Sequence, residues 1–249
     1  METNEYQKMF ELENDYWWYR ALHELVEHEV HTVGRTNLKL LDVGCGTGRT
    51  MEILRSYGQV EGVDYSPEAI FFSTKRGNNA ILGDINTLTI NPNTYDIILC
   101  LDVLYHAAIQ DDHAVMAKLY RGLAPGGLLI MELPAFDLLK RHHDVMVFGK
   151  RRYRKKATRA VLQKIGFHTI IDTYRLPLLF LFLLIKKVIE RVKVPDTAVS
   201  DLKPLPRSLN AFLLWVTRIE NRLITWGIGM PFGSSLFIVA KKTRDSLYV

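Results

Sequence analysis

One segment, residues 38–54, constrains the fold of this chain more than any other. Its first six residues are mostly apolar; Gly44, Gly46 and Gly48 follow, and then a stretch that can begin a helix. This order predicts a buried strand, a tight loop and a helix. Glycines let the backbone turn sharply and let a ligand approach it, while a helix N-terminus presents unpaired N–H groups. The segment therefore predicts a ligand-binding loop.

The residues around the loop indicate which ligand it holds. The spacing is G-x-G-x-G, whereas a dinucleotide site has G-x-G-x-x-G, and Asp42 precedes the loop, where a carboxylate would repel a pyrophosphate. An ammonium or sulfonium group suits that carboxylate. Residues 41–48 resemble the first motif of the class I S-adenosylmethionine-dependent methyltransferases. The resemblance implies S-adenosylmethionine as the cofactor, with Asp42, the three loop glycines and Thr47 as contacts. A nicotinamide cofactor and a glycine turn without a ligand are the less favoured alternatives.

Length, charge and cysteine content fit this interpretation. A chain of 249 residues suits one α/β domain with insertions, and its net charge of +5 permits an anionic partner without requiring one. Cys45 and Cys100, the only two cysteines, form neither a disulfide framework nor a metal-ligand spacing, so no metal is expected. The acidic N-terminus lacks the apolar region of a signal peptide. These features predict a cytoplasmic protein.

A second acidic strand end follows the loop. Asp64 closes a short strand expected over residues 59–64, about 20 residues beyond the loop, the spacing at which a carboxylate accepts hydrogen bonds from ribose hydroxyls. Tyr65 and Ser66 come directly after it and are expected beside the cofactor. Ser66 can also cap the next helix. Asp64 is thus the strongest single cofactor residue that the sequence offers.

A third acid stands at the end of the strand expected over residues 80–85. In open α/β sheets, ligands bind outside the carboxyl ends of the strands, where Asp84 and Ile85 would lie. The resemblance implies that Asp84 bonds the adenine amino group and that Ile85 packs on the ring. A lone Asp after a strand is more often a helix cap, so these two assignments depend on the preceding motifs.

The fourth strand leads into the expected active-site loop. Residues 95–100 form the apolar run of a central parallel strand. Leu101 is expected to contact the cofactor and Tyr105 the acceptor. His106 titrates in the range of a general base, although alignment of the reacting atoms alone can suffice and His106 could instead line the pocket or cap a helix. The loop lacks the Asn-Pro-Pro-aromatic signature of related enzymes that act on nucleic-acid bases, so a nucleic-acid partner is not expected.

An aromatic cluster at residues 16–20 lies within a region of helical spacing, residues 5–33. Packing of this helix on the sheet is one interpretation. The resemblance implies another, an N-terminal segment that closes over the cofactor. Tyr19 would then face the sulfonium, and Arg20 would pair with the methionine carboxylate.

The loop after the fifth strand resembles that of a narrower, type 11 subgroup of these enzymes, in which it lies over the pocket. His143, Asp144 and Tyr153 are the expected substrate contacts, because the chain would bring them near His106. Seven of the ten residues at 150–159 are Lys or Arg. They indicate either a site for a phosphate, carboxylate or anionic lipid surface, or a solvated helix start.

The main departure from the resembled fold is a long insertion at residues 176–233. It contains two helical segments, at 177–185 and 209–228, and precedes a final strand. The resemblance implies that this strand pairs antiparallel at the sheet edge. The first segment is too short to span a membrane, which needs about 20 apolar residues. The segments could pack on each other, cover an apolar substrate, form a homodimer contact, or make peripheral membrane contact through residues 177–193.

Together these features predict a Rossmann-like α/β fold of the class I methyltransferase type. The sheet would be mostly parallel with an antiparallel final strand, with helices on both faces. One domain is expected over residues 1–249. Its parts are an N-terminal helical cap (1–36), the core (37–175), the helical insertion (176–233), and the final strand and tail (234–249).

The predicted function is S-adenosylmethionine-dependent methyl transfer by in-line displacement. The acceptor would be a small or lipid-like metabolite with a hydroxyl, carboxyl or amine. The alternative is a non-catalytic adenosylmethionine-binding or membrane-associated scaffold. A cytoplasmic protein of either kind could lie peripherally at the inner face of a membrane.

Overall fold

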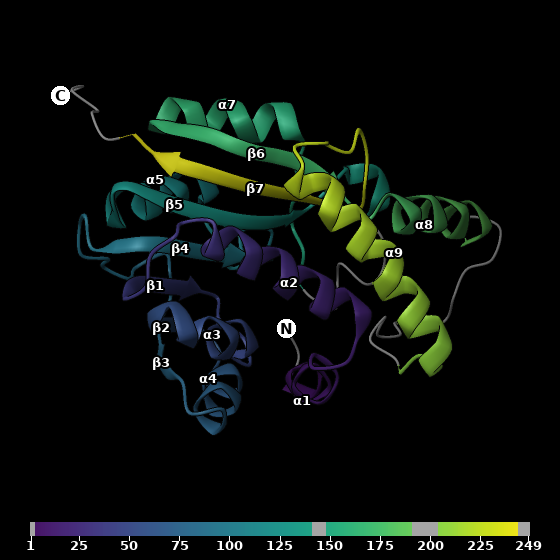
Figure 1. Ribbon diagram of the computed structural model, residues 1–249, viewed down its shortest axis with the longest axis horizontal. Coiled ribbons are helices and arrows are strands. Elements are labelled where there is room, and N and C mark those ends of the chain that lie inside the picture. The colour runs from purple at the N-terminus through teal and green to yellow at the C-terminus, as the bar shows by residue number, and fades with distance from the viewer. Residues whose placement is uncertain (1–2, 141–147, 191–203, 244–249) are drawn as a thin grey trace.

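The computed structural model describes residues 3–140, 148–190 and 204–243, which fold into one seven-stranded sheet flanked by helices (Figure 1). The order of the strands is β3-β2-β1-β4-β5-β7-β6. Their bounds are β1 Leu38–Val43, β2 Gly58–Asp64, β3 Asn79–Leu82, β4 Tyr95–Leu101, β5 Leu123–Pro134, β6 Phe167–Arg175 and β7 Ser235–Lys242. Strands β1 to β5 pair in parallel, whereas β7 is antiparallel to β5 and β6. The predicted class of sheet is confirmed.

The position of β7 differs from the prediction. This strand was expected at the edge of the sheet, but it lies between β5 and β6, so that β6 forms the edge. Residues 235–240 are all buried, because neighbouring strands cover both sides of β7 and helices cover both faces of the sheet. An unbroken apolar run is typical of such an interior strand. The edge assignment was therefore wrong.

Helices cover both faces of the sheet. Their bounds are α1 Thr3–Leu12, α2 Trp17–His31, α3 Arg49–Leu54, α4 Pro67–Lys75, α5 Asp112–Gly122, α7 Lys155–Ile165, α8 Pro177–Glu190 and α9 Arg207–Thr225, with short 3-10 turns at Arg55–Tyr57 and Asp137–Leu139. Side chains of α2, α3 and α9 pack on one face, and those of α5 and α7 on the other. The N-terminal region of helical spacing forms two helices, because the chain turns at residues 13–16.

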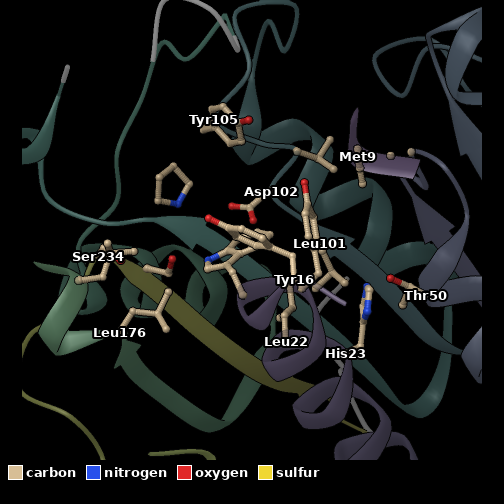
Figure 2. A pocket seen from close by; sticks show the side chains of 18 of the residues that line it. Met9, Tyr16, Leu22, His23, Thr50, Leu101, Asp102, Tyr105, Leu176 and Ser234 are labelled. Carbon is tan, nitrogen blue, oxygen red and sulfur yellow. The ribbon is translucent and has the colours of Figure 1, made fainter. Parts of the chain in front are cut away.

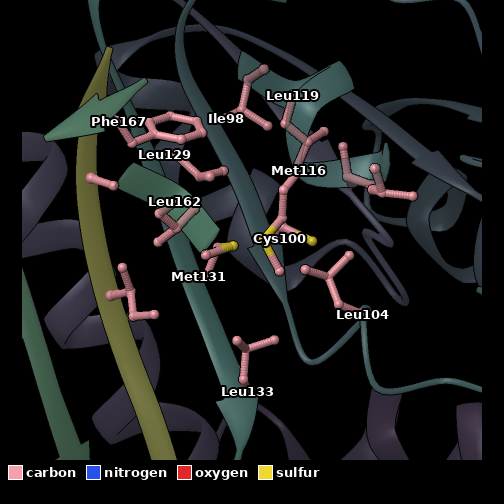
Figure 3. Packing of buried hydrophobic residues seen from close by; sticks show 14 of the residues in the cluster. Ile98, Cys100, Leu104, Met116, Leu119, Leu129, Met131, Leu133, Leu162 and Phe167 are labelled. Carbon is pink, nitrogen blue, oxygen red and sulfur yellow. The ribbon is translucent and has the colours of Figure 1, made fainter. Parts of the chain in front are cut away.

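The core follows the period-two alternation of the central strands. Ile98 and Cys100 of β4 point toward α5 and α7, where they meet Met116, Leu119 and Leu162 (Figure 3). Ile97 and Leu99 point to the opposite face, toward α2 and α9. Successive side chains of a strand leave opposite faces of the sheet, so a strand buried on both faces must be apolar throughout. Polar groups are consequently confined to the ends of these strands.

The Pro-Gly-Gly segment at residues 125–127 lies inside β5 rather than before it. Tyr95 of β4 pairs with Leu123, but Ile97 pairs with Leu128, so residues 124–127 bulge out of the ladder. Strand β5 therefore begins at Leu123, before the Pro-Gly-Gly segment, rather than after it. A bulge of this kind lets two strands of unequal length keep one register toward their carboxyl ends.

The two helices of the insertion, α8 and α9, fall where helical segments were expected. Helix α9 packs along α2, whereas α8 contacts the turn at Asp137–Leu139. Asn210 of α9 clamps the start of α2: its side chain donates to the Asp15 carbonyl at 2.8 Å and accepts from the Trp17 N–H at 2.9 Å. None of the described helices is both long and apolar enough to cross a membrane.

Candidate active site

A cavity of about 1170 Å³ lies at the carboxyl ends of β1, β2 and β4, beneath the N-terminal helices. Figure 2 shows Leu101 at the end of β4 and Asp102 just beyond it, near Met9 of α1, His23 of α2 and Tyr16 in the turn between these helices. The strand ends and the residues just beyond them supply a group of polar lining residues: Asp42, Asp64, Tyr65, Asp84, Asp102, Tyr105 and His106. This is the edge of an open α/β sheet at which ligands bind.

The glycine loop has a backbone that other residues would strain. Gly44 has φ +73° and Gly48 has φ +80°. A Cβ on Gly44 would lie 2.3 Å from Val103 Cγ2, and one on Gly48 would lie 2.2 Å from Asn78 Nδ2. The N–H of Gly44 also donates to the Val63 carbonyl at 2.7 Å, which holds the loop against β2. Gly44 and Gly46 line the cavity, as predicted for the loop.

Asp64 connects the glycine loop to the start of α4. One carboxylate oxygen accepts the Gly46 N–H and the other accepts the Ser66 N–H, each at 3.0 Å. Burial raises the pKa of Asp64, and these backbone N–H groups oppose the shift. Ser66 itself caps α4 by accepting from the Ala69 N–H and lies outside the cavity lining, whereas Tyr65 is part of it.

Asp42 is buried at the end of β1 and lines the cavity. Within the described part of the chain its carboxylate has no hydrogen-bond partner, in contrast to Asp64. Burial, followed by the nearby charge of Asp64, raises the pKa of Asp42 to about 7. A buried carboxylate facing a cavity without a partner fits a cationic ligand group.

Asp84 and Ile85 line the cavity just beyond β3, which ends at Leu82, earlier than expected. Asp84 Oδ1 accepts the backbone and side-chain N–H groups of Asn86 at 2.9 and 2.7 Å, as in a turn cap. Ile85 is buried. Asp84 therefore makes local capping bonds, as a lone Asp after a strand commonly does, and it also lines the cavity.

The N-terminal helices supply a wall that the sequence reasoning only partly identified. Tyr19 lines the cavity and is buried against Trp18, with ring centroids 4.8 Å apart. Arg20 lies outside the lining, and its guanidinium is 3.9 Å from Glu24. Tyr6 and His23 also line the cavity and were not predicted, although the helical spacing of apolar and aromatic residues includes Tyr6.

A buried polar link ties α1 to the glycine loop. Thr47 Oγ1 donates to Glu13 at 2.5 Å, and Arg76 contacts the same carboxylate at 2.7 Å. Arg76 also bonds Glu52 of α3 at 2.9 Å. Thr47 is thus engaged with Glu13 and lies outside the cavity lining. The link fixes the N-terminal helices over the cavity, which only the folded chain could reveal.

His106 lines the cavity with a defined tautomer. Its Nδ1 accepts the Ala108 N–H at 3.1 Å, so in the neutral ring the proton is on Nε2, which lies 3.3 Å from the Tyr65 hydroxyl. Burial lowers the pKa of His106. In this arrangement Nε2–H can donate to the Tyr65 hydroxyl, and the Nδ1 lone pair accepts the backbone N–H of Ala108.

The structure separates Tyr153 from the other expected substrate contacts. Its ring is buried, and its hydroxyl lies 2.9 Å from the Leu104 carbonyl and 2.8 Å from Asp112 Oδ2, away from the cavity. Tyr105, in contrast, lines the cavity. His143 and Asp144 lie outside the described residues.

A buried ion pair lies behind Asp102 and was not foreseen. Arg175 of β6 and Glu132 of β5 are fully buried, with Nη1 2.8 and 2.9 Å from the two carboxylate oxygens. Asp102, at φ +53°, donates its N–H to the Glu132 carbonyl. The charge of Arg175 acts on Asp102, Glu132 and Glu220. Glu132 follows an apolar run of β5 and Arg175 ends β6, 43 residues further along the chain, so sequence spacing gave no sign that they meet.

The far half of the cavity is mostly apolar and is formed by the insertion, although Lys186, Thr217 and Glu220 of the same helices also line it. Helices α8 and α9 face it from two sides, and their contributions include Leu178, Leu179, Phe182, Leu183, Leu209, Leu213, Val216 and Leu223. Leu176, just before α8, and Ser234, just before β7, also line the cavity (Figure 2). The cavity therefore has a polar end at the strand termini and an apolar end between α8 and α9.

Comparisons with known proteins agree with this geometry. Residues 41–131 match the family described as methyltransferase domain. The chain is 28% identical over 146 residues to the ubiquinone biosynthesis O-methyltransferase of Paraburkholderia xenovorans, covering 51% of this chain and 60% of that protein. It is 27% identical over 175 residues to a phosphoethanolamine N-methyltransferase of Triticum aestivum, covering 66% of this chain and 34% of that protein.

A solved structure from Thermotoga maritima has the same fold over nearly the whole chain. It is described as an S-adenosylmethionine-dependent methyltransferase, a possible histamine N-methyltransferase, and it covers 96% of this chain and 95% of its own, with TM-score 0.59 and 18% identity. The matched regions of the two curated relatives span 60% or less of their lengths. Residues 41–131 therefore match a methyltransferase domain, and the fold that surrounds them is shared with an S-adenosylmethionine-dependent methyltransferase of solved structure.

Proposed function

We propose that the chain transfers a methyl group from S-adenosylmethionine to a small or lipid-like metabolite that carries a hydroxyl, carboxyl or amine. The observation that supports this most is the continuous cavity with one polar and one apolar end. Its volume of about 1170 Å³ exceeds the roughly 300–1000 Å³ of a pocket for one small molecule, so two ligands could occupy it together.

The polar end fits the cofactor. Asp42 offers a buried carboxylate without a partner to a cationic group, and Asp64, fixed by two backbone N–H groups, retains lone pairs for ribose hydroxyls. Asp84 and Ile85 lie at the same edge, where an adenine would be bound. When bound, S-adenosylmethionine supplies an electrophilic methyl group on a positively charged sulfur.

The residues of this chain would act mainly by alignment and by exclusion of water. Tyr105 and His106 stand where the acceptor atom would approach the methyl group, and the apolar side chains of α8 and α9 would hold the rest of the acceptor. Correct placement of two reactants contributes a large part of the rate enhancement in such displacements. A dry cavity also strengthens the electrostatic contacts inside it.

Transfer of tritium from labelled S-adenosylmethionine to metabolite and lipid extracts tests the proposed function. We expect a labelled product in one fraction and none with heat-denatured protein. Cofactor binding shown by calorimetry without transfer to any fraction would refute the enzymatic proposal and favour a non-catalytic adenosylmethionine-binding scaffold.

Cofactor affinity should fall as the pH drops below about 7. The pKa of Asp42 is raised to about 7, so part of this carboxyl is protonated at neutral pH, and a bound cation favours the ionised form. Protons and cofactor therefore compete. We expect the dissociation constant, measured by calorimetry, to rise by up to about ten-fold per pH unit below the pKa. The variant Asp42→Asn should bind S-adenosylmethionine weakly and with little dependence on pH. A dissociation constant that does not change with pH in the parent protein would contradict the assignment of Asp42 to the cationic group of the cofactor.

Replacement of His106 should have a moderate effect. The general-base role stays a prediction. In the structure the ring directs its Nε2–H at Tyr65 beside the cavity, and its Nδ1 lone pair accepts the Ala108 N–H. We therefore expect His106→Gln, which keeps a donor, to slow transfer by less than about ten-fold, whereas loss of a general base typically costs about 10²–10⁴-fold. Because burial lowers the pKa of His106, the ring is neutral above about pH 7 and should cause no inflection there. A pH–rate profile whose acid limb disappears in His106→Gln, with a loss in the larger range, would instead establish the base role.

A further inference from the structure

The mouth of the apolar half of the cavity carries large exposed side chains. Leu178 and Phe182 of α8 and Leu209 and Ile219 of α9 line the cavity, yet they are 55%, 59%, 43% and 38% exposed. Residues that both line a cavity and face solvent mark its opening. One opening of the cavity therefore lies between α8 and α9 and has an apolar rim, in addition to the opening at Tyr65 and Leu82 near the strand ends.

The rim continues onto the outer faces of both helices. Ile185 of α8 and Phe212 and Trp215 of α9 are exposed and do not line the cavity. Phe212 and Trp215 stack on each other, with ring centroids 6.2 Å apart. Contiguous exposed apolar patches on a folded chain are uncommon and usually mark a surface that binds a partner. We refer to the outer faces of α8 and α9, together with the mouth, as the α8–α9 rim.

The charges on these helices are of one sign. Among their described side chains the sole acid is Glu220, which is buried and accepts the Leu176 N–H at 2.8 Å. The ionised side chains at the surface are cationic: Lys186, Lys187, Arg207, Arg218 and Arg222. Of these, Arg218 is paired with Glu24 of α2, and Lys187 donates to the carbonyls of Leu138 and Lys140. Arg222 lies two helical turns beyond Trp215 and so on the same side of α9.

We infer that the α8–α9 rim docks on an anionic lipid surface. Apolar helix faces bordered by Lys and Arg lie in the interface of a bilayer, with the apolar side chains below the headgroups and the cations near the phosphates. A second copy of this chain fits the rim less well. In a two-fold contact the same cations would face each other, and the described acid of these helices is buried.

Docking would place the mouth of the cavity against the bilayer. A lipid-like acceptor could then pass from the membrane into the apolar half without crossing water. This consequence depends on the proposed function, whereas the docking itself does not, because the rim residues lie apart from the cofactor contacts at the strand ends.

Flotation of the full chain with vesicles, without cofactor or acceptor, tests the docking. We expect binding to vesicles of phosphatidylcholine and phosphatidylserine, and weak binding to phosphatidylcholine alone. Ile185→Ser combined with Trp215→Ser should lower the partition constant at least about ten-fold, since both side chains would be buried in the interface. Arg222→Glu should weaken binding to the anionic vesicles alone.

The matched control is Phe71→Ser combined with Ile170→Ser. These side chains are 64% and 52% exposed, like Ile185 and Trp215, but they lie on α4 and β6. Binding equal to the parent is expected.

Absence of the parent protein from both vesicle fractions, or an equal loss in the control and rim variants, would overturn the inference. A dimer that forms without lipid would also overturn the inference if the rim variants dissociate it, as measured by sedimentation velocity. The rim would then be a contact with a second copy of this chain. Methyl transfer without docking would refute only this inference, and docking without transfer only the proposed function.

Discussion

Asp64→Ala is expected to weaken S-adenosylmethionine binding by more than ten-fold, at least about 1.4 kcal/mol. The substitution removes the acceptor proposed for the ribose hydroxyls. It also leaves the N–H groups of Gly46 and Ser66, both now bonded at 3.0 Å, without their acceptor, so the glycine loop loses its link to α4. Calorimetric titration of the folded variant with S-adenosylmethionine measures the effect.

Asp96→Ala is the matched control for this loss. Asp96 also anchors backbone, since it accepts the Lys39 N–H at 2.9 Å, and it pairs with Arg35. It lies near the amino end of β4, whereas the cavity lies at the carboxyl ends of the strands. We expect an unchanged dissociation constant in this variant. An unchanged constant in Asp64→Ala as well would refute the ribose assignment.

Arg175→Met is expected to lower the free energy of unfolding by about 3–5 kcal/mol. The guanidinium is fully buried and bonded to both oxygens of Glu132, which is also fully buried. Removing it leaves an uncompensated carboxylate between β5 and β6, close to Asp102 and Glu220. Equilibrium unfolding in urea, followed by circular dichroism, measures the loss.

Two further variants separate the buried pair from an ordinary surface ion pair. Arg159→Met removes a partly exposed arginine that bonds Asp172, and it should cost less than about 1 kcal/mol. The double variant Glu132→Met with Arg175→Met should recover part of the stability, because apolar side chains can replace a buried pair. Equal losses in Arg175→Met and Arg159→Met would contradict the importance of burial.

The sequence was most informative where function depends on local order along the chain. Asp42, Gly44 and Gly46 lie within a few residues of one another. Their spacing predicted a ligand-binding loop, and all three residues line the cavity. Asp64, Asp84 and Leu101 were expected at the cofactor from their places at the ends of strands and from the family resemblance, and all three line the cavity, because parallel strands end on one side of a sheet. Thr47, Gly48 and Ser66 share this local order but lie outside the lining, because the loop and the helix cap turn them away.

The sequence was less informative where residues far apart in the chain meet. Periodicity identifies the buried face of a helix but not its partner, so the apolar spacing of α8 and α9 left packing, a substrate cover, membrane contact and dimer contact open. Arg20 and Tyr153 were placed at the site by resemblance and by proximity along the chain, yet the structure pairs Arg20 with Glu24 and buries Tyr153 beside Leu104 and Asp112.

By itself, therefore, the sequence determined the class of sheet through its resemblance to a known family. It also determined the glycine loop and the acids at the strand ends, because these depend on short-range spacing and on the two-residue period of a strand. Tertiary structure alone decided that β7 lies inside the sheet, that Glu132 and Arg175 form a buried pair behind Asp102, and that α8 and α9 enclose the apolar half of the cavity. These features depend on contacts between segments distant in the chain, whose geometry no local pattern encodes.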